Sequence, residues 1–411
     1  MIALAISKKT WTASAKEATP GTAITTPTLY LPTVNTFKGV KKKVYLNEER
    51  GDRNANYQVV DSIRASQIEL KGPYYPDSSP VAIWGGLGLP SSATTALTAT
   101  TKHTFQLQDI PATYTLFRHL DAKSYYIPYS SMAKFSLHFT ADGKLLELDS
   151  TWQGLFAVIN GAPPTPVYTT VLPIAGYAPT LKFSDNIVSQ DVTDFQLDYA
   201  QQLLLFYPAN GVADFVTVYF GERTIDLTLS ARFDTDTLYQ RFRVSNIIDA
   251  LTFDIQGPLV ANFNVSLGSP SAGNFTLTFN AQTTAGIAFN ATAAAVQAAL
   301  ALLTTVPANS MIVTGGVGGP YGIQLTGVLA GSALALTGSG VGLTGGTFAV
   351  NAGTLFNELN IVLPTVSWDT MEHDTTKTNV MIKAVGKAIV PGGGSSLITG
   401  FVQNAIPSYT T

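Results

Sequence analysis

The sequence contains no cysteine in its 411 residues. Disulfide bonds, thiol catalysis and cysteine metal ligands are therefore excluded. Only 12% of the residues are charged, about half of the roughly 25% that is usual for soluble domains. A surface with so little charge has to be covered by Ser, Thr, Asn, Gln and Gly or by other subunits, and we expect both. The composition therefore indicates a protein that forms an assembly.

Basic surfaces and long apolar runs are also missing. The net charge is −3 and the isoelectric point is near 5.8, so no nucleic-acid-binding surface is indicated. The start, Met1–Lys9, has no charged n-region and too short an apolar run for a signal peptide. No stretch reaches the roughly 18 apolar residues of a membrane span, and Gln297 interrupts the nearest one, Ala293–Leu303. We expect a soluble protein.

Residues that could carry chemistry are scattered rather than clustered. The four histidines are His103, His119, His138 and His373. They show neither i,i+4 spacing nor a carboxylate set suited to a metal, and no activated serine accompanies the pair of His119 and Asp121. The Gly340–Gly345 segment matches a dinucleotide-binding pattern, but a predicted strand follows it instead of a helix. We expect no enzyme and no catalytic, metal or cofactor site.

The pattern of one stretch, Arg64–Trp84, recurs later in the chain. An alternating strand leads to an N-cap at Asp77 or Ser78 and then to a short helix, which the pair Gly85-Gly86 is expected to end. The same order of strand, capped turn and short helix recurs in Arg223–Phe242. The sequence therefore predicts a tandem duplication.

The predicted fold class is mainly β, with two tandem β-sandwich or half-barrel domains, each flanked by a short helix, and an inserted small α/β module. The expected parts are an N-terminal arm (1–35), a first domain (36–160), a second domain split into 161–267 and 355–390, the inserted module (268–354), and a C-terminal linker and arm (391–411). Within this scheme Val192–Leu197 is matched with Lys41–Leu46. An Asp-Gly turn predicts a hairpin over Lys134–Gly154.

The predicted insertion differs sharply in composition from the rest of the chain. From Ile255 to Asn357 there is no Asp, Glu, Lys, Arg or His. Its strand-like runs surround an Ala-rich helix, Thr292–Leu303, capped by Thr292. We expect a separate core formed by Phe275, Leu277, Phe279, Val296, Leu300 and Leu303. The flanking runs Leu251–Leu267 and Glu358–Trp368 are predicted to be neighbouring strands, so the module would sit at a hairpin tip.

Two loops are predicted to contact other subunits. Asn47–Tyr57 is long, charged and rich in turn formers, so it is either a disordered surface loop or a loop that contacts a partner. We favour the partner contact. Its contact candidates are Glu48, Glu49, Arg50, Asp52 and Arg53. The corresponding region near Ala200–Val212 is apolar, and its candidates are Leu203, Phe206 and Tyr207. The two terminal arms are further candidates for contacts between stacked rings.

These features resemble one known family. Lys16–Ala23 followed by Thr28–Pro32 resembles the N-terminal arm of siphophage major tail tube proteins. The charged loop before the strand–helix unit and the closing run Ile361–Trp368 are similar to that family as well, and the resemblance covers nearly all of 1–257 and 355–411. The insertion resembles a small module that recurs in phage virion proteins.

The resemblance implies domains that join edge to edge into rings, with the inner sheet lining a channel for DNA. It also implies a virion tail component assembled in the host cytoplasm, with a tape measure protein and genomic DNA in the lumen, no sequence-specific DNA binding and no membrane. The lumen should be acidic or neutral, with few or paired Lys and Arg. Most members supply one tube domain per chain and form hexamers, so two domains in this chain favour a trimeric ring with pseudo-sixfold symmetry.

Three other classes remain open. The uncharged, Thr- and Gly-rich insertion would suit a cell-surface or capsid-decorating adhesion protein, although no secretion signal is present. A tube protein of type VI secretion is related, but such chains are shorter and have a single domain. A polysaccharide-cleaving β-protein would need clustered carboxylates and aromatic residues, which are not found.

Overall fold

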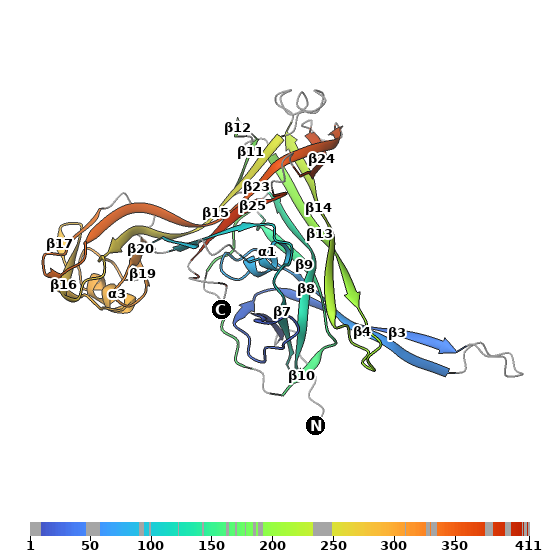
Figure 1. Cartoon of the computed structure of the whole chain (residues 1–411). Helices are drawn as coiled ribbons and strands as arrows, with labels where there is room; N and C mark the ends of the chain where they lie inside the picture. The colour runs from blue at the N-terminus through green and yellow to red at the C-terminus, as the bar shows by residue number, and fades with distance from the viewer. Residues whose placement is uncertain are drawn as a thin grey trace, which may run out of the picture.

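The computed structural model describes residues 10–46, 58–89, 94–97, 100–121, 123–141, 144–161, 164–168, 171–176, 178–183, 186–187, 192–232, 249–308, 310–325, 329, 335–374, 381–390, 396–404, 406 and 409. Strands make up 62% and helices 6% of these described residues, so the chain is mainly β, as predicted. No helix among these residues is long and apolar enough to cross a membrane. Figure 1 shows a main body of long strands, a hairpin projecting on one side and a small lobe at the end of two strands on the other.

The first half of the chain forms ten strands and helix α1 (Pro80–Leu87). The strands are β1 (Thr10–Lys16), β2 (Leu29–Leu31), β3 (Val34–Leu46), β4 (Gln58–Lys71), β5 (Thr94–Leu97), β6 (Thr100–Gln106), β7 (Tyr114–Leu120), β8 (Lys123–Thr140), β9 (Glu147–Gly154) and β10 (Val158–Asn160). The predicted hairpin is the second half of β8 with β9.

The second half of the chain adds eight strands to the main body. They are β11 (Pro179–Phe183), β12 (Asn186–Ile187), β13 (Val192–Phe206), β14 (Thr217–Arg232), β15 (Asp249–Ser266), β23 (Ala349–Asp374), β24 (Met381–Ala388) and β25 (Thr399–Asn404). Between β15 and β23 lies the small lobe, called the inserted module below. It contains β16 (Ala272–Phe279), β17 (Gln282–Thr283), β18 (Ile287–Ala288), α3 (Ala293–Ala301), β19 (Met311–Gly315), β20 (Tyr321–Leu325), β21 (Leu336–Ser339) and β22 (Leu343–Thr344).

The strand ladders of the two halves follow the same plan. Counterparts with the same neighbours are β1 and β11, β2 and β12, β3 and β13, β4 and β14, β7 and β15, β8 and β23, β9 and β24, and β10 and β25. The hairpin of β5 and β6 has no such counterpart among the described residues; β6 pairs with β25. A shared ladder plan of this length supports the predicted duplication.

Irregularities in the ladders fix the alignment of the two copies residue by residue. A bulge follows Lys41 in the β3–β4 pair, at the place where one follows Gln201 in the β13–β14 pair. Lys41 lies opposite Arg64 and Gln201 opposite Arg223, so Arg64 aligns with Arg223, as predicted. Bulges are structural features that change twist and direction, and matching positions indicate matching geometry.

The predicted match of Val192–Leu197 with Lys41–Leu46 is wrong. Leu197 lies opposite Leu227, and the first-copy residue in that place is Phe37, opposite Ile68. The error arose because the outer part of β3 carries apolar residues that are exposed and not part of the core. Their alternation imitates that of a buried strand.

Helix α1 lies in the middle of the core, and its bounds differ from the prediction. Ser79 occupies the N-cap position, and the helix continues through Gly85 and Gly86 to Leu87. All eight of its residues are buried. A Cβ at Gly85 would collide with the ring of Trp152, and one at Gly86 with Met132. The two glycines therefore allow the helix to approach the sheet closely and do not end it. The second predicted helix, in Arg223–Phe242, falls outside the described residues.

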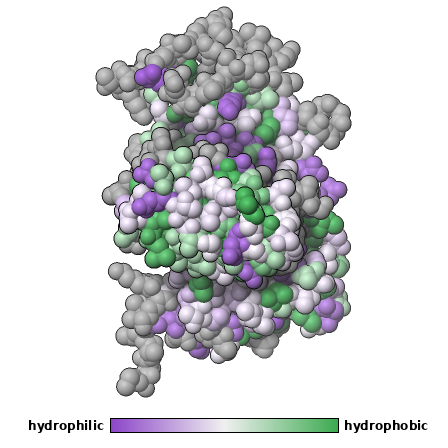
Figure 2. Space-filling view, turned by 90° about the vertical axis from the view of Figure 1, so that its left-hand side faces the viewer, coloured by the Kyte–Doolittle hydropathy of each residue, from purple (hydrophilic) through white to green (hydrophobic). Residues whose placement is uncertain are grey.

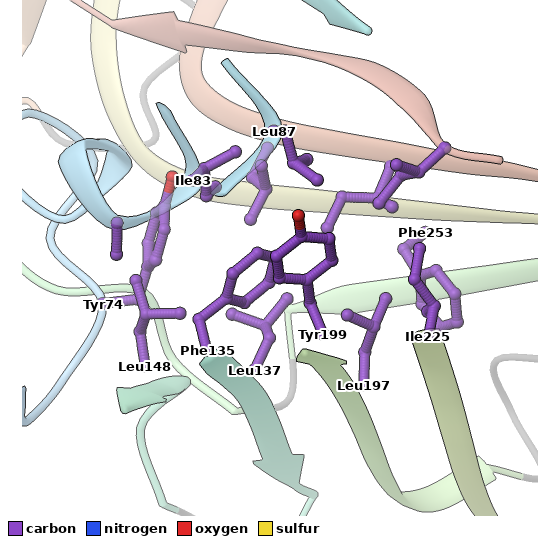
Figure 3. Packing of buried hydrophobic residues seen from close by; sticks show 14 of the residues in the cluster. Tyr74, Ile83, Leu87, Phe135, Leu137, Leu148, Leu197, Tyr199, Ile225 and Phe253 are labelled. Atoms are coloured by element: carbon purple, nitrogen blue, oxygen red, sulfur yellow. The ribbon is translucent and has the colours of Figure 1, made fainter. Parts of the chain in front are cut away.

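Both copies share one hydrophobic core. Figure 3 shows side chains from both copies, among them Phe135, Leu137, Leu197 and Tyr199, packed under α1. The rings of Phe135 and Tyr199 stack with centroids 5.0 Å apart, and the Tyr199 hydroxyl donates a hydrogen bond of 2.8 Å to the carbonyl of Gly86. The two similar halves therefore form one packed body.

The described parts of both predicted arms belong to the fold. Strand β1 pairs with β7 along its whole length and buries Trp11, Ala13 and Ala15. At the other end of the chain β25 pairs with both β6 and β23, and the ring of Tyr409 packs edge-on against Trp84 at 5.5 Å. The described parts of these segments are therefore paired within their own chain.

The inserted module replaces the turn of a hairpin. In the first copy Leu120 lies opposite Lys123 at the end of the β7–β8 hairpin. The residues in the same place in the second copy are Ile255 and Leu359, which lie opposite each other in the β15–β23 pair. The insertion thus extends over 256–358, close to the limits of the uncharged stretch and wider than the predicted 268–354.

The module has its own core, which shares no residue with the main one. The six predicted core residues are all buried in it, together with Phe263 and Val265 from β15. Thr292 caps α3 as predicted, accepting a hydrogen bond of 3.2 Å from the amide of Ala295. No residue of the main core lies between Ile255 and Leu359. The module is therefore packed independently, at the end of two strands that leave the main body.

The close contact between α1 and the sheet can be tested by adding one methyl group. We expect Gly85→Ala to lower the free energy of unfolding by about 1–3 kcal/mol, because the new Cβ overpacks the site against Trp152. Gly161→Ala is the control, since nothing lies within 4 Å of its Cβ position. Denaturant unfolding followed by tryptophan fluorescence measures both. Equal stability of Gly85→Ala and the wild type would contradict the packing role.

Candidate assembly surface

The two copies join into one continuous antiparallel sheet of eight strands. The order is β3, β4, β9, β8, β13, β14, β24, β23. The first four strands belong to the first copy and the last four to the second. The copies meet where the second half of β8 pairs with β13, from Lys134 opposite Ala200 to Thr140 opposite Asp194.

The face of this sheet that points away from α1 is polar, because side chains alternate along each strand. Its acidic residues are Glu69, Glu147, Asp149, Asp194, Asp198, Asp226 and Glu372, and its lysines and arginine are Lys38, Lys71, Lys134, Arg232, Lys383 and Lys387. The face is hollowed beside the junction of the copies, where an open cavity of about 1030 Å³ is bordered by Thr140, Asp194 and Glu372. It is a concave surface of mixed charge, on which the acids outnumber the lysines and arginine by one among the described residues.

Some of the charges on this face are paired within the chain. Lys71 lies 3.4 Å from Asp149, and Lys387 lies 3.9 Å from Asp226. These pairs are solvent-exposed, so each contributes little to stability. Their effect is to reduce the number of free cations on the concave face.

Both ends of the eight-stranded sheet have an open edge. Among the described residues β3 pairs only with β4. From Ser367 onward the described part of β23 pairs only with β24. An open edge presents unpaired backbone N–H and C=O groups, which are a template for pairing with another chain.

The hairpin of β3 and β4 projects well beyond the main body (Figure 1). Its apolar side chains Val40, Val44, Tyr45, Val59 and Val60 are 40–58% exposed. A two-stranded hairpin is only marginally stable by itself in water. An apolar, projecting hairpin is therefore a surface that another subunit would cover.

The corresponding hairpin of the second copy, β13 with β14, contains three of the predicted contact residues. Phe206 is 49% exposed, and its ring lies 6.2 Å from that of Tyr219, which is 55% exposed. Leu203 is half-buried. Tyr207 packs edge-on against Phe215 at 6.2 Å, and burial, with a smaller effect of a nearby carboxylate, raises the pKa of its hydroxyl. Only Phe206 of the three is well exposed.

The tip of this second hairpin is held on the first copy. Asp214 receives two hydrogen bonds from the Arg64 guanidinium, of 2.7 and 2.8 Å, and the Arg64 amide donates to the carbonyl of Ala213. A bidentate pair of this kind fixes orientation as well as contact. Arg223 takes the place of Arg64 in the second copy. It donates to the Asp109 carbonyl, but its Nε is buried without a hydrogen-bond partner among the described residues.

The remaining predicted contact residues, Glu48, Glu49, Arg50, Asp52 and Arg53, fall outside the described residues. The prediction also missed several surface residues. Exposed Leu204 and Tyr219 lie opposite each other beside Phe206, and Lys38 and Glu372 lie on the two open edges. Alternation in β13 could have indicated Leu204, but the edges become visible only from the order of the strands.

Two of the four histidines, His103 and His119, pack against neighbouring groups of the fold. The ring of His119 stacks on Trp11 at 5.1 Å and lies 2.7 Å from the Ser124 hydroxyl. His103 is buried, which lowers its pKa, and its Nε2 lies 2.8 Å from the carbonyl of Ile406. Within the described part of the chain, no group of three or more His, Asp or Glu side chains could hold a metal ion.

The chain was compared with models of known protein families. A family model described as "Phage tail tube protein" matches residues 12–258. The match covers the first copy and the second copy up to the start of the insertion. No curated protein matches the chain.

The exposed aromatic pair at the β13–β14 tip can be tested by removing its apolar surface. We expect Phe206→Ser with Tyr219→Ser to prevent large assemblies while changing the free energy of unfolding by only about 0.5 kcal/mol, because both rings are largely in solvent. Val341→Ser, at a position 94% exposed in the module, is the matched control. Analytical ultracentrifugation gives the assembly size. Assemblies of normal size from the double variant would show that this tip is not a contact.

Proposed function

The chain belongs to the phage tail tube protein family, and on that basis we propose that it polymerises into stacked rings that form the tail tube of a long-tailed phage. The tube would be the channel through which the genome is delivered. The observation that carries this proposal is the continuous eight-stranded sheet with an open edge at each end. Joining such sheets edge to edge around a ring leaves no edge unpaired, which is the usual solution for an exposed sheet.

Three chains per ring are the proposed stoichiometry. Each chain supplies two four-stranded units with the same ladder plan. A ring of three chains then contains six similar units and has pseudo-sixfold symmetry. We propose the five parts expected from the sequence with two changes. The insertion is 256–358, and residues 10–35 and 396–404 belong to the tube domains.

The concave polar face is the proposed lining of the channel. It lies on the opposite side of the sheet from α1 and the core, and acids outnumber lysines on it. Affinity for nucleic acid comes mainly from cations that contact phosphates. A face whose basic residues are slightly outnumbered by acids and partly paired with them would let genomic DNA slide without sequence-specific binding, and would hold a tape measure protein before the DNA enters.

The inserted module is proposed to lie on the outside of the tube. In Figure 1 it lies on the side of the main body that carries α1, away from β13 and β14. Figure 2, viewed from the module's side, shows mostly pale and green residues with scattered purple ones. The module's own core means that its folding does not depend on the tube.

Electron microscopy and native mass measurement of the purified chain test the proposed function. We expect stacked rings or tubes with threefold symmetry and a mass of three chains for a single ring. The reason is that a closed ring pairs the β3 edge of each chain with the β23 edge of the next, so that no open edge remains. Monomers at every concentration would contradict the tube, and rings of six chains would contradict the stoichiometry.

Removing the module tests its independence from the tube. We expect a chain in which Gln256–Glu358 is replaced by Asn-Gly to fold and form tubes of smaller outer diameter. The replacement restores the two-residue connection at the equivalent β7–β8 tip, and Asn-Gly is the preferred pair for such turns. Electron microscopy measures the diameter.

The matched comparison is a chain with the same Asn-Gly replacing only Leu267–Phe348, which keeps the two protruding strands up to the pair of Ser266 and Ala349. Tubes from both variants support an external, dispensable module. A folded chain that forms no tubes in either case would show that the module takes part in the tube itself.

A further inference from the structure

Within one chain, the pairing of β8 with β13 shows how the first copy joins the second. Where β8 pairs with β13, Ser136 lies opposite Asp198 and Leu137 opposite Leu197. The open edges at the two ends of the sheet belong to β23 and β3, which are the counterparts of β8 and β13. We infer that β23 of one subunit pairs with β3 of the next in the register of the internal β8–β13 junction. This inference rests on the proposed ring and names the residues that join it.

The bulges show which residues of β23 and β3 correspond to the paired residues of β8 and β13, and so give the register of the contact between subunits. The β8–β9 pair shifts register after Met132, and the β23–β24 pair does so after Trp368, so Glu372 takes the place of Ser136. The shared bulge after Lys41 and Gln201 places Lys38 where the second copy has Asp198. Ser136 and Asp198 are direct partners. In the next subunit, Lys38 therefore lies directly opposite Glu372.

The charges agree with this register. Lys38 and Glu372 are both exposed on the polar face, and neither forms an ion pair with another described residue of its own chain. Opposite charges directly across a strand pair are stabilising, and like charges are destabilising. A shift by two residues would place Glu372 opposite Thr36 or Val40, and a shift by one would turn the strand over. The Lys38–Glu372 pair thus selects the register.

The buried face of the same junction is less well filled than its internal counterpart. The internal junction stacks Phe135 on Tyr199. The corresponding residues between subunits are Met371 and Gly39, and a flexible methionine can fill the irregular space that a glycine leaves. The contact between subunits therefore depends more on backbone pairing and on the charged pair than the internal junction does.

A second observation points to the same partner. The internal junction brings Asp214 of the second copy onto Arg64 of the first. Arg223 takes the place of Arg64, and its Nε is buried without a hydrogen-bond partner among the described residues. If the contact between subunits repeats the β8–β13 junction, a neighbouring subunit covers Arg223 just as the second copy covers Arg64.

Disulfide cross-linking tests the register directly, because the natural chain has no cysteine. We expect Lys38→Cys with Glu372→Cys to give covalent chains of subunits in oxidised assemblies, ending in a closed ring. Directly opposed residues have Cα atoms about 4.5–5.5 Å apart, within disulfide range. Thr36→Cys with Glu372→Cys is the matched control, since diagonal neighbours are about 7–8 Å apart. Ser136→Cys with Asp198→Cys is the positive control within one chain.

Each outcome of the cross-linking decides one question. Cross-links from the Lys38 pair but not from the Thr36 pair support the register. Cross-links from the Thr36 pair or from a Val40→Cys, Glu372→Cys pair would overturn the register while leaving the proposed tube intact. Tubes in which none of the three pairs cross-links would overturn the β23–β3 contact. Absence of rings or tubes in the wild type would instead reject the proposed function.

Charge reversal gives a test without cysteine. We expect Lys38→Glu or Glu372→Lys alone to raise the concentration needed for assembly roughly tenfold, the effect of replacing an attractive cross-strand pair by a repulsive one. The double reversal should restore assembly only in part, because the new lysine at 372 also lies opposite Lys383 of its own chain. If the double variant assembles no better than the single ones, the two residues do not face each other.

Discussion

The structure depends on one constraint, which is that the edges of β-strands must be paired. Inside the chain the junction of β8 with β13 meets this requirement by joining the two copies into one sheet. The same requirement is unmet at β3 and at the outer half of β23 among the described residues. The surface most important for assembly is therefore made of backbone groups, and side chains such as Lys38 and Glu372 select which backbone groups pair.

Close packing behind the sheet keeps these edges in position. Helix α1 is wholly buried, and Gly85 and Gly86 bring its backbone against the rings and side chains of both copies. The hydrogen bond from Tyr199 of the second copy to the carbonyl of Gly86 in the first links the two copies through the core. A shared core makes the chain a rigid double unit, so that the relative position of its two open edges is determined before assembly. Such preorganisation favours a closed ring over an open chain.

Much of the fold could be predicted from patterns of residues. Strand alternation and the strand–turn–helix order revealed the duplication and the alignment of Arg64 with Arg223, and the uncharged stretch revealed the insertion. The bounds of the insertion were set too narrowly because β15 and β23 continue from the body into the module as strands, although the limits of the uncharged stretch lie within one residue of 256–358. Gly85 and Gly86 were misread as a helix end because close approach to another element leaves no local signal. The pairing of Lys38 with Glu372 depends on bulges and strand order, which composition and spacing do not indicate.

A reconstruction of the assembled protein at side-chain resolution by electron cryo-microscopy tests the central claim most directly, because it shows both kinds of junction in one map. The account predicts that the contact between subunits superposes on the internal β8–β13 junction, with the backbone of β3 hydrogen-bonded to β23 along the sheet. A free β23 edge, or a different strand paired with it, would contradict the account.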